Sequence, residues 1–130
     1  MALTSVVVTL WYRPPEVLLQ ASYTTSVDIW SIGCIICELL SLKPLFPGSS
    51  EIDQLHTIFK TLGSPRIEDW PGNAAVDINC FADIEPRALS HTVLRLRELP
   101  LVNDLLEGMV KMDAGMRMNA NDCLRHKWFE

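Results

Sequence analysis

The longest apolar stretch of the chain runs from Val27 to Leu42 and has the pattern of a buried helix. Its polar residues lie on one narrow side of a helical wheel, and the remaining positions are apolar. A helix that is apolar almost all round packs inside a protein. Lys43-Pro44 ends it, because proline disfavours helical backbone at the residue before it. The polar residues of this predicted helix are Asp28, Ser31, Glu38 and Ser41.

A second helix is predicted after Ser49-Ser50, which can cap its first turn, with Asp53 close to the positive end of the helix dipole. Gly63 fits the position just past the helix end, and Pro65 prevents its continuation. Apolar residues between these limits recur every three or four positions, which predicts one buried face. That face comprises Ile52, Leu55, Phe59 and Leu62.

Two further helices are predicted in the last third of the chain. Pro100 can open the first of them, because its fixed φ suits the first helical position. Asn119 and Asp122 have the spacing of a capping box, which predicts a short last helix ending near His126. The inner face of the helix after Pro100 is expected to use Leu101, Leu105, Leu106, Met109 and Val110.

The remaining segments predict loops. Residues 1–14 are expected to be extended, and a short helical turn is expected after Pro15, over Val17 to Leu19. Residues 63–92 lack periodicity, and an irregular insert of that length is usually functional or disordered. No strand pattern occurs after residue 10, so the sequence predicts an all-α fold with long loops.

Composition and charge narrow the class of protein. A chain of 130 residues is one domain or part of a larger one, and 48% hydrophobic with 21% charged residues is typical of a globular protein. A net charge of −5 without any basic run argues against a nucleic-acid partner. Residues 1–4 lack the positive region of a signal peptide, and residues 29–42 are too short and too polar to span a membrane.

Cys34 and Cys37 form a single C-x-x-C pair. Such a pair is compatible with a metal site, with a redox site, or with two buried thiols that have neither role. No second pair and no nearby histidine completes a metal site. Both cysteines lie in the apolar stretch, where a free cysteine behaves as a small hydrophobic residue. Buried thiols are therefore the favoured interpretation, no metal ligand is assigned, and an intracellular, reducing compartment is expected.

Five short motifs follow one another along the chain. In this order they resemble the C-terminal lobe of a eukaryotic protein kinase, nearest the cyclin-dependent kinases and, within them, the branch that pairs with D-type cyclins. The resemblance covers essentially the whole chain and is weakest over about 72–98. The family pattern is not matched at Pro14, Ala114 and Lys127. The motifs are Thr9-Leu10-Trp11-Tyr12-Arg13-Pro14-Pro15-Glu16, Asp28-Ile29-Trp30-Ser31-Ile32-Gly33-Cys34, Lys43-Pro44-Leu45-Phe46-Pro47-Gly48, Asp113-Ala114-Gly115-Met116-Arg117 and His126-Lys127-Trp128-Phe129.

The resemblance implies a mainly α fold, namely the helical C-terminal lobe of the protein kinase fold, incomplete in this chain. Residues 1–16 would be the end of the activation segment. Residues 17–129 would form the lobe helices, with the insert typical of this kinase group at about 63–98. The implied function is part of a proline-directed cyclin-dependent serine/threonine kinase, which transfers phosphate from ATP to proteins in cell-cycle control.

The resemblance also assigns roles near the N-terminus, with Val8, Thr9 and Arg13 as substrate-binding residues. The carbonyl of Val8 would turn away from the substrate, so the residue after the target Ser or Thr finds no acceptor for its N–H. Proline, which has no N–H, suffers least from this arrangement. Arg13 would brace the turn, and Thr9 would hydrogen-bond the catalytic aspartate and lysine. Thr4 stands where the family adds its activating phosphate, although its residue type alone indicates only an exposed hydroxyl.

Three charged residues have structural roles under the same resemblance. Glu16 would form a mostly buried ion pair with Arg117, and removal of one partner would cost about 3–5 kcal/mol of stability. Asp28 would accept hydrogen bonds from backbone N–H groups of the catalytic loop. The alternative for Asp28 is an acid favourably placed near a helix N-terminus.

The parts of a kinase that hold nucleotide and metal do not occur in this sequence, which has no G-x-G, H-R-D or D-F-G. No catalytic residue and no cofactor are therefore expected in this chain, which alone is expected to be inactive. ATP and magnesium are implied only for the full-length family. The implied partners are a D-type cyclin and proteins with Ser/Thr-Pro sites, and the implied location is the cytoplasm and nucleus.

Two interpretations of the whole chain stay open, so its status as an enzyme is not decided. It is either a piece of such a kinase or a non-catalytic kinase-like module that binds proteins through the helices at 50–62 and 99–111. In the family the helix at 27–42 packs against elements upstream of residue 1. Exposed Ile, Leu and Trp side chains forfeit roughly 1.5–3 kcal/mol each, so the isolated chain is expected to be molten, oligomeric or chaperone-bound.

Overall fold

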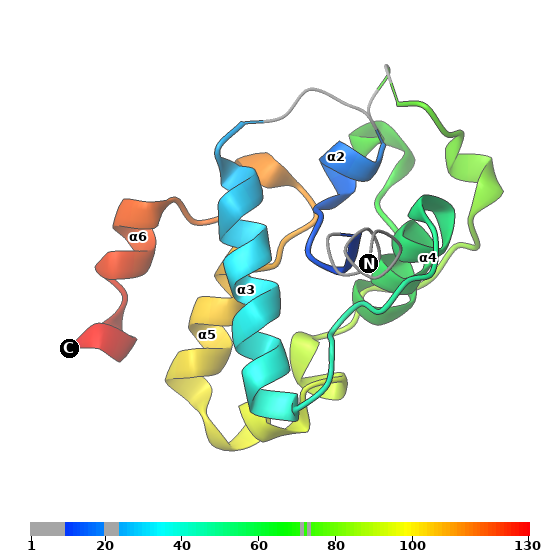
Figure 1. Cartoon of the computed structure of the whole chain (residues 1–130). Coiled ribbons are helices and arrows are strands. Elements are labelled where there is room, and N and C mark those ends of the chain that lie inside the picture. The colour runs from blue at the N-terminus through cyan, green and yellow to red at the C-terminus, as the bar shows by residue number, and fades with distance from the viewer. Residues whose placement is uncertain (1–9, 20–23, 71, 73) are drawn as a thin grey trace, which may run out of the picture.

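The computed structural model describes residues 10–19, 24–70, 72 and 74–130, and this part of the chain is helical with no strand (Figure 1). The predicted all-α fold is confirmed. The α-helices are α2 (Pro15–Leu18), α3 (Ser26–Ser41), α4 (Glu51–Leu62), α5 (Pro100–Met109) and α6 (Ala120–Leu124). Single 3-10 turns lie at Ile67–Asp69, Ile78–Cys80, Leu89–His91, Leu94–Glu98, Ala114–Met116 and Lys127–Phe129.

Helix α3 runs through the middle of the molecule and packs against α5 (Figure 1). Its limits lie within one residue of the predicted ones. Trp30, Cys34 and Cys37 are at most 1% exposed and form the centre of the core. The ring of Phe46, which follows the helix, stacks on Trp30 with the ring centroids 5.5 Å apart. The predicted K-P-L-F loop therefore folds back onto the helix that it leaves.

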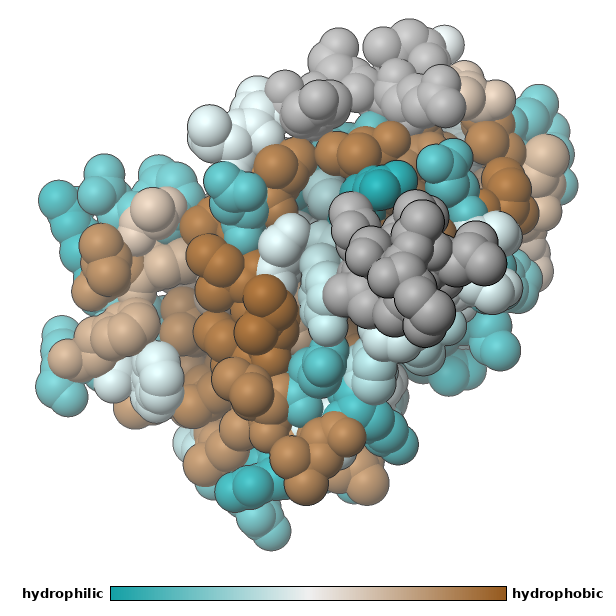
Figure 2. Space-filling view, in the orientation of Figure 1, coloured by the Kyte–Doolittle hydropathy of each residue, from teal (hydrophilic) through white to brown (hydrophobic). Residues whose placement is uncertain are grey.

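Helix α3 was predicted to be a buried helix that packs partly against elements upstream of residue 1, and among the described residues one of its apolar faces is open. Four apolar residues on that face, at positions 32, 35, 39 and 42, are called the α3 stripe. Their spacing of three, four and three places them in one row along the helix. Figure 2 shows this row as a band of apolar surface. The exposed fractions are 46% for Ile32, 45% for Ile35, 71% for Leu39 and 89% for Leu42.

Helix α4 begins and ends where its capping residues predict. The hydroxyl of Ser50 accepts a hydrogen bond of 3.1 Å from the N–H of Asp53. Gly63 has φ +100°, and a side chain there would collide with the backbone of Pro86. Both helix limits are therefore set by local chemistry that the sequence displays.

The buried face of α4 differs from the predicted one. Ile52 was expected inside but is 50% exposed, whereas Gln54 and Ile58 are fully buried. The inner face is rotated because the N-terminal half of α4 packs against the loop that ends at Gly48 and against Trp11. A buried glutamine on this face is not anticipated from the apolar pattern.

The irregular insert packs on the outer side of α4. Trp70 and Phe81 approach Phe59 edge-on, with ring centroids 6.1 and 5.0 Å from its ring. The hydroxyl of Ser64 donates to the carbonyl of Ala82 and accepts from the N–H of Ile84, at 2.8 and 2.7 Å. These contacts give the described part of the insert a defined conformation without regular helices.

Helices α5 and α6 begin where the sequence predicts, but one inward-facing position of α5 and the end of α6 differ from the prediction. Pro100 opens α5, but Leu101 is 46% exposed, and Val102 takes the expected inner position. The capping box of α6 is present, and the helix ends at Leu124, two residues before the predicted end. The ring of His126 then bonds to Asp104 of α5 at 2.7 Å. This bond attaches the last turn to α5, on the opposite side of α3 from α4 (Figure 1).

Candidate peptide-binding segment

The candidate site is the segment Leu10–Pro14, which precedes α2. Residues 1–14 were predicted to be extended, but Leu10 and Trp11 are helical, and the N–H of Arg13 donates to the carbonyl of Leu10 at 3.1 Å. In this turn Leu10 is part of the buried core and only 4% exposed. The predicted extended backbone did not anticipate this burial. Pro14 is extended, with ψ 163°, as expected for a residue before proline. Thr4, Val8 and Thr9 lie outside the described residues.

Tyr12 attaches this segment to α3. Its hydroxyl donates a hydrogen bond of 2.6 Å to a carboxylate oxygen of Glu38. Its carbonyl accepts a bond of 2.7 Å from the hydroxyl of Ser31. The bond to Glu38, assisted by burial, raises the pKa of Tyr12 to about 12, because ionisation would place a phenolate beside a carboxylate.

Trp11 and Arg13 attach the same segment to α4 and to the loop before it. The indole N–H of Trp11 donates to the carbonyl of Gly48 at 2.9 Å, and its own carbonyl accepts from the amide of Gln54 at 3.4 Å. The guanidinium of Arg13 lies 3.5 Å from the carboxylate of Glu51. Consecutive residues therefore contact two helices, which fixes the position of the segment between α3 and α4.

Glu16 and Arg117, assigned to each other by the resemblance, are adjacent in the structure. Two nitrogens of the guanidinium donate to the two carboxylate oxygens, at 2.6 and 2.7 Å. The guanidinium is fully buried and lies 5.0 Å from the ring centre of Trp30. It also donates to the carbonyls of Ser26, Lys111 and Met112. This paired and fully hydrogen-bonded charge joins α2, the start of α3 and the loop after α5.

Asp28 lies in the first turn of α3 and is exposed. Among the residues that the structure describes, none donates a hydrogen bond to its carboxylate. The backbone amides that the resemblance assigns to it therefore have no counterpart in that part of the chain. Its position near a helix N-terminus is electrostatically favourable.

Three residues of the site are absent from the sequence-based assignment: Glu38, Gln54 and Glu51. Glu38 and Ser31 belong to the polar side of α3, and that polar row on an apolar helix indicates a polar neighbour, which is Tyr12. Gln54 interrupts the apolar positions of α4, but its burial depends on where the distant Trp11 lies. Only the contact with Ser31 and Glu38 had a usable sequence signal.

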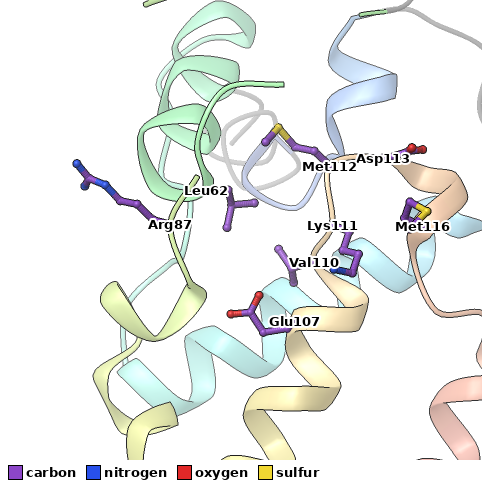
Figure 3. A pocket seen from close by; sticks show the side chains of 8 residues that line it. All are labelled: Leu62, Arg87, Glu107, Val110, Lys111, Met112, Asp113 and Met116. Carbon is purple, nitrogen blue, oxygen red and sulfur yellow. The ribbon is translucent and has the colours of Figure 1, made fainter. Parts of the chain in front are cut away.

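A separate cavity of about 270 Å³ lies between the end of α4, the insert and the end of α5. Figure 3 shows Leu62 and Val110 in this pocket, with Glu107 at one side. A carboxylate oxygen of Glu107 accepts from the N–H of Leu89 at 2.8 Å. No residue of the predicted site lines it. The lining residues are Leu62, Arg87, Glu107, Val110, Lys111, Met112, Asp113 and Met116.

The cysteines of the C-x-x-C pair are buried free thiols. Burial raises the pKa of Cys37 to about 12 and that of Cys34 well above its ordinary value. A raised pKa disfavours the thiolate that metal binding and redox exchange require. The described residues contain no group of three His, Cys, Asp or Glu side chains suited to a metal ion. None of the helices in the described ranges is long and apolar enough to cross a membrane.

Comparison with known proteins identifies the family. Residues 1–129 match the model of the protein kinase domain. The chain is 45% identical over 128 residues to cyclin-dependent kinase 4 of Ovis aries and 45% identical over 130 residues to that of Xenopus laevis. Cyclin-dependent kinase G1 of Arabidopsis thaliana is 41% identical over 140 aligned residues.

These alignments include 97–99% of this chain but only part of each relative. The chain spans 42%, 40% and 22% of the length of the three relatives, respectively. The described helices agree with the helical C-terminal lobe of the kinase fold. The chain belongs to the protein kinase family, and within that family it is similar to the cyclin-dependent kinases.

Proposed function

We propose that this chain forms the peptide-binding side and helical scaffold of a proline-directed cyclin-dependent serine/threonine kinase. The anchoring of residues 10–13 to both α3 and α4 carries the proposal. A groove that selects among peptides needs a floor whose position is fixed before the peptide arrives. The hydrogen bonds that Trp11 and Tyr12 make with α3, α4 and the loop before α4 provide such a floor.

The proposed selectivity arises next to that floor. Under this proposal the carbonyl of Val8 would turn away from the peptide, so a substrate N–H after the target Ser or Thr would lose its acceptor, and proline would avoid this loss. Arg13 braces the turn, and its partner on α4 is Glu51. Thr9 would hydrogen-bond the catalytic aspartate and lysine of the complete kinase, and Thr4 would receive the activating phosphate.

The proposed partners come from the relatives and from the family. The cyclin is of the D type, and the substrates are proteins with Ser/Thr-Pro sites in the cytoplasm and nucleus. ATP and magnesium supply the phosphoryl group and its charge neutralisation in a complete kinase. The sequence lacks the motifs that hold them, so we expect the 130-residue chain to transfer no phosphate by itself. Nucleic acid and membrane are not proposed partners, in line with the net charge of −5.

Peptide binding tests the proposal directly. Two labelled peptides that differ only in Ser-Pro or Ser-Ala are titrated with the chain, and their fluorescence anisotropy is measured. We expect the Ser-Pro peptide to bind several-fold more tightly, because it has no unpaired N–H. Equal affinities for the two peptides would contradict a proline-directed groove.

A chimera tests the catalytic part of the proposal. Residues 1–129, which match the kinase-domain model, replace the corresponding region of a cyclin-dependent kinase 4, and phosphorylation of the Ser-Pro peptide is measured with and without a D-type cyclin. We expect cyclin-dependent activity from the chimera and none from the chain alone. Turnover by the purified chain would contradict its expected inactivity. A folded but inactive chimera would contradict the proposed role of the chain in a cyclin-dependent kinase.

A non-catalytic binding module is the second candidate function, and the cavity between α4 and α5 favours it. The cavity of about 270 Å³ is near the lower size limit of ligand pockets and suits one or two apolar side chains of a partner. Met112 and Met116 are flexible enough to adapt to them. In this case Met112→Lys would abolish partner capture and leave Ser-Pro discrimination unchanged.

A further inference from the structure

Gln54 is a buried amide on α4, with no exposed surface. Its side-chain oxygen accepts a hydrogen bond of 2.8 Å from the N–H of Gly48. Its side-chain nitrogen donates to the carbonyl of Trp11 at 3.4 Å. A buried amide is tolerated when both of its ends are bonded, and here each end contacts a different segment of the chain.

A third hydrogen bond closes these contacts into a ring. The indole N–H of Trp11 donates to the carbonyl of Gly48 at 2.9 Å. Trp11, Gly48 and Gln54 therefore each bond to the other two. The Trp11–Gly48–Gln54 ring joins the candidate peptide-binding segment, the loop after α3 and helix α4.

The ring requires glycine at its centre. A Cβ atom at Gly48 would collide with the side-chain oxygen, Cα and backbone nitrogen of Gln54. The loop can approach α4 closely enough for the bond only because Gly48 has no side chain. A larger residue at this position would separate the loop from the helix and open the ring.

The other polar contacts of residues 10–13 do not hold the segment to α4 in the same way. The pair between Arg13 and Glu51 is 3.5 Å long, with side chains 28% and 56% exposed, so water and salt screen it. Tyr12 bonds to α3 and leaves the distance to α4 undetermined. Among the hydrogen bonds of residues 10–13, the bond from Gln54 is therefore the one that attaches Trp11 directly to α4.

We propose that Gln54 is a positioning residue of the peptide groove, acting through Gly48 and Trp11. It does not touch the peptide and instead fixes where residues 10–13 lie. The inference deepens the proposed function and rests on it for the identity of the peptide. Loss of the ring is expected to free Trp11 and to weaken binding of a Ser-Pro peptide.

Solvent exchange of indole N–H groups, followed by NMR, tests the inference in the 130-residue chain. Trp70 is an internal reference, because its indole donates to the carbonyl of Val76 at 2.9 Å, outside the ring. In Gln54→Leu we expect exchange at Trp11 to accelerate about tenfold relative to Trp70, since the ring loses two of its three bonds. The affinity for the Ser-Pro peptide is expected to fall by a similar factor.

Two variants separate positioning from general destabilisation. Ile58→Val removes a methyl group from the same buried face of α4 without touching the ring, and it should leave the Trp11 to Trp70 exchange ratio unchanged. Gln54→Glu should give a pH-dependent ratio. A neutral carboxyl group both donates and accepts as the amide does, whereas the carboxylate only accepts. Protection of Trp11 should therefore return at low pH.

The outcomes distinguish the two proposals. If the ratio of Trp11 to Trp70 exchange rates is unchanged in Gln54→Leu, the positioning role is overturned. This holds also when both rates increase equally. Equal affinity of the wild-type chain for Ser-Pro and Ser-Ala peptides overturns the proposed function, whatever the exchange shows. A pH-independent ratio in Gln54→Glu also counts against positioning by hydrogen bonds.

Discussion

The guanidinium of Arg117 forms two hydrogen bonds with the carboxylate of Glu16, at 2.6 and 2.7 Å, across 101 positions of sequence. Replacement of Arg117 by Met would leave a buried carboxylate without a partner. We expect the free energy of unfolding in urea to fall by about 3–5 kcal/mol.

Two further variants check the origin of that loss. Arg13→Met removes the exposed pair with Glu51 and should cost less than about 1 kcal/mol. The double variant Glu16→Met with Arg117→Met should be more stable than Arg117→Met alone, because no charge remains unpaired. Equal losses for Arg13 and Arg117 would show that burial of the pair has no energetic effect.

The bond between Tyr12 and Glu38 predicts an alkaline transition. The pKa of Tyr12 rises from 10.0 to about 12, because the phenol donates to a carboxylate. The contribution of the Tyr12–Glu38 bond to the free energy of unfolding is complete below pH 10 and is lost as the pH rises from 10 to about 12. An absorbance titration in a Tyr23→Phe background, which leaves one tyrosine, should show this midpoint. Glu38→Gln should move the midpoint back toward 10, and an unchanged midpoint would contradict the bond.

Thiol labelling should separate the cysteines by burial. Cys80 is exposed and should react at once with a disulfide reagent, whereas Cys34 and Cys37 should react only on unfolding, since their high pKa values disfavour the thiolate. Cys80→Ser is the matched control and should remove the fastest phase, leaving the half-buried Cys123 as the next thiol to react. Fast reaction of Cys34 or Cys37 in the folded chain, or zinc bound in a stoichiometric amount, would restore the redox or metal interpretation.

The α3 stripe predicts that the isolated chain self-associates. Burial of one Leu side chain is favourable by roughly 1.5–3 kcal/mol, so several together can hold copies of the chain in contact. Sedimentation should show oligomers for the wild type and a shift toward monomer for Leu39→Lys. The control is Ile67→Lys, because Ile67 is 76% exposed but lies outside the stripe. A wild-type monomer with one sharp melting transition would contradict this expectation.

The end of α3 offers a stabilising substitution. Leu42 has φ +62°, a left-handed conformation that strains a side chain with a Cβ atom. Leu42→Gly should therefore raise the free energy of unfolding by about 1 kcal/mol. Leu94→Gly is the comparison, since Leu94 is also exposed but lies in a 3-10 turn, and it should destabilise. Destabilisation by both variants would show that the strain at Leu42 is negligible.

Helix limits were predictable because the residues that set them act locally. Each residue acts on the backbone within a few positions of itself. Ser50 and Asn119 accept hydrogen bonds from N–H groups of the first turn, Pro100 opens α5, and Gly63 ends α4. Which residues face inward was less predictable, since Ile52 and Leu101 face solvent. That choice depends on segments distant in sequence, which an apolar pattern does not identify.

The same contrast applies to the candidate site. The resemblance placed Glu16 beside Arg117, but the residue pattern gave no indication that Gln54 would be buried. Its burial requires Trp11, Gly48 and α4 to meet, and each lies in a different part of the chain. The hydrogen-bond donors for Asp28 could not be predicted from this sequence. The resemblance assigns them to the catalytic loop, and the sequence lacks that loop.

The pair between Glu16 and Arg117 also has a consequence for biosynthesis. A ribosome adds Arg117 101 residues after Glu16, so α2 leaves the exit tunnel long before its partner exists. During that interval the carboxylate must remain in water, and the first helices cannot dock in their final arrangement. We therefore expect the nascent chain to remain a target for holding chaperones until Arg117 emerges.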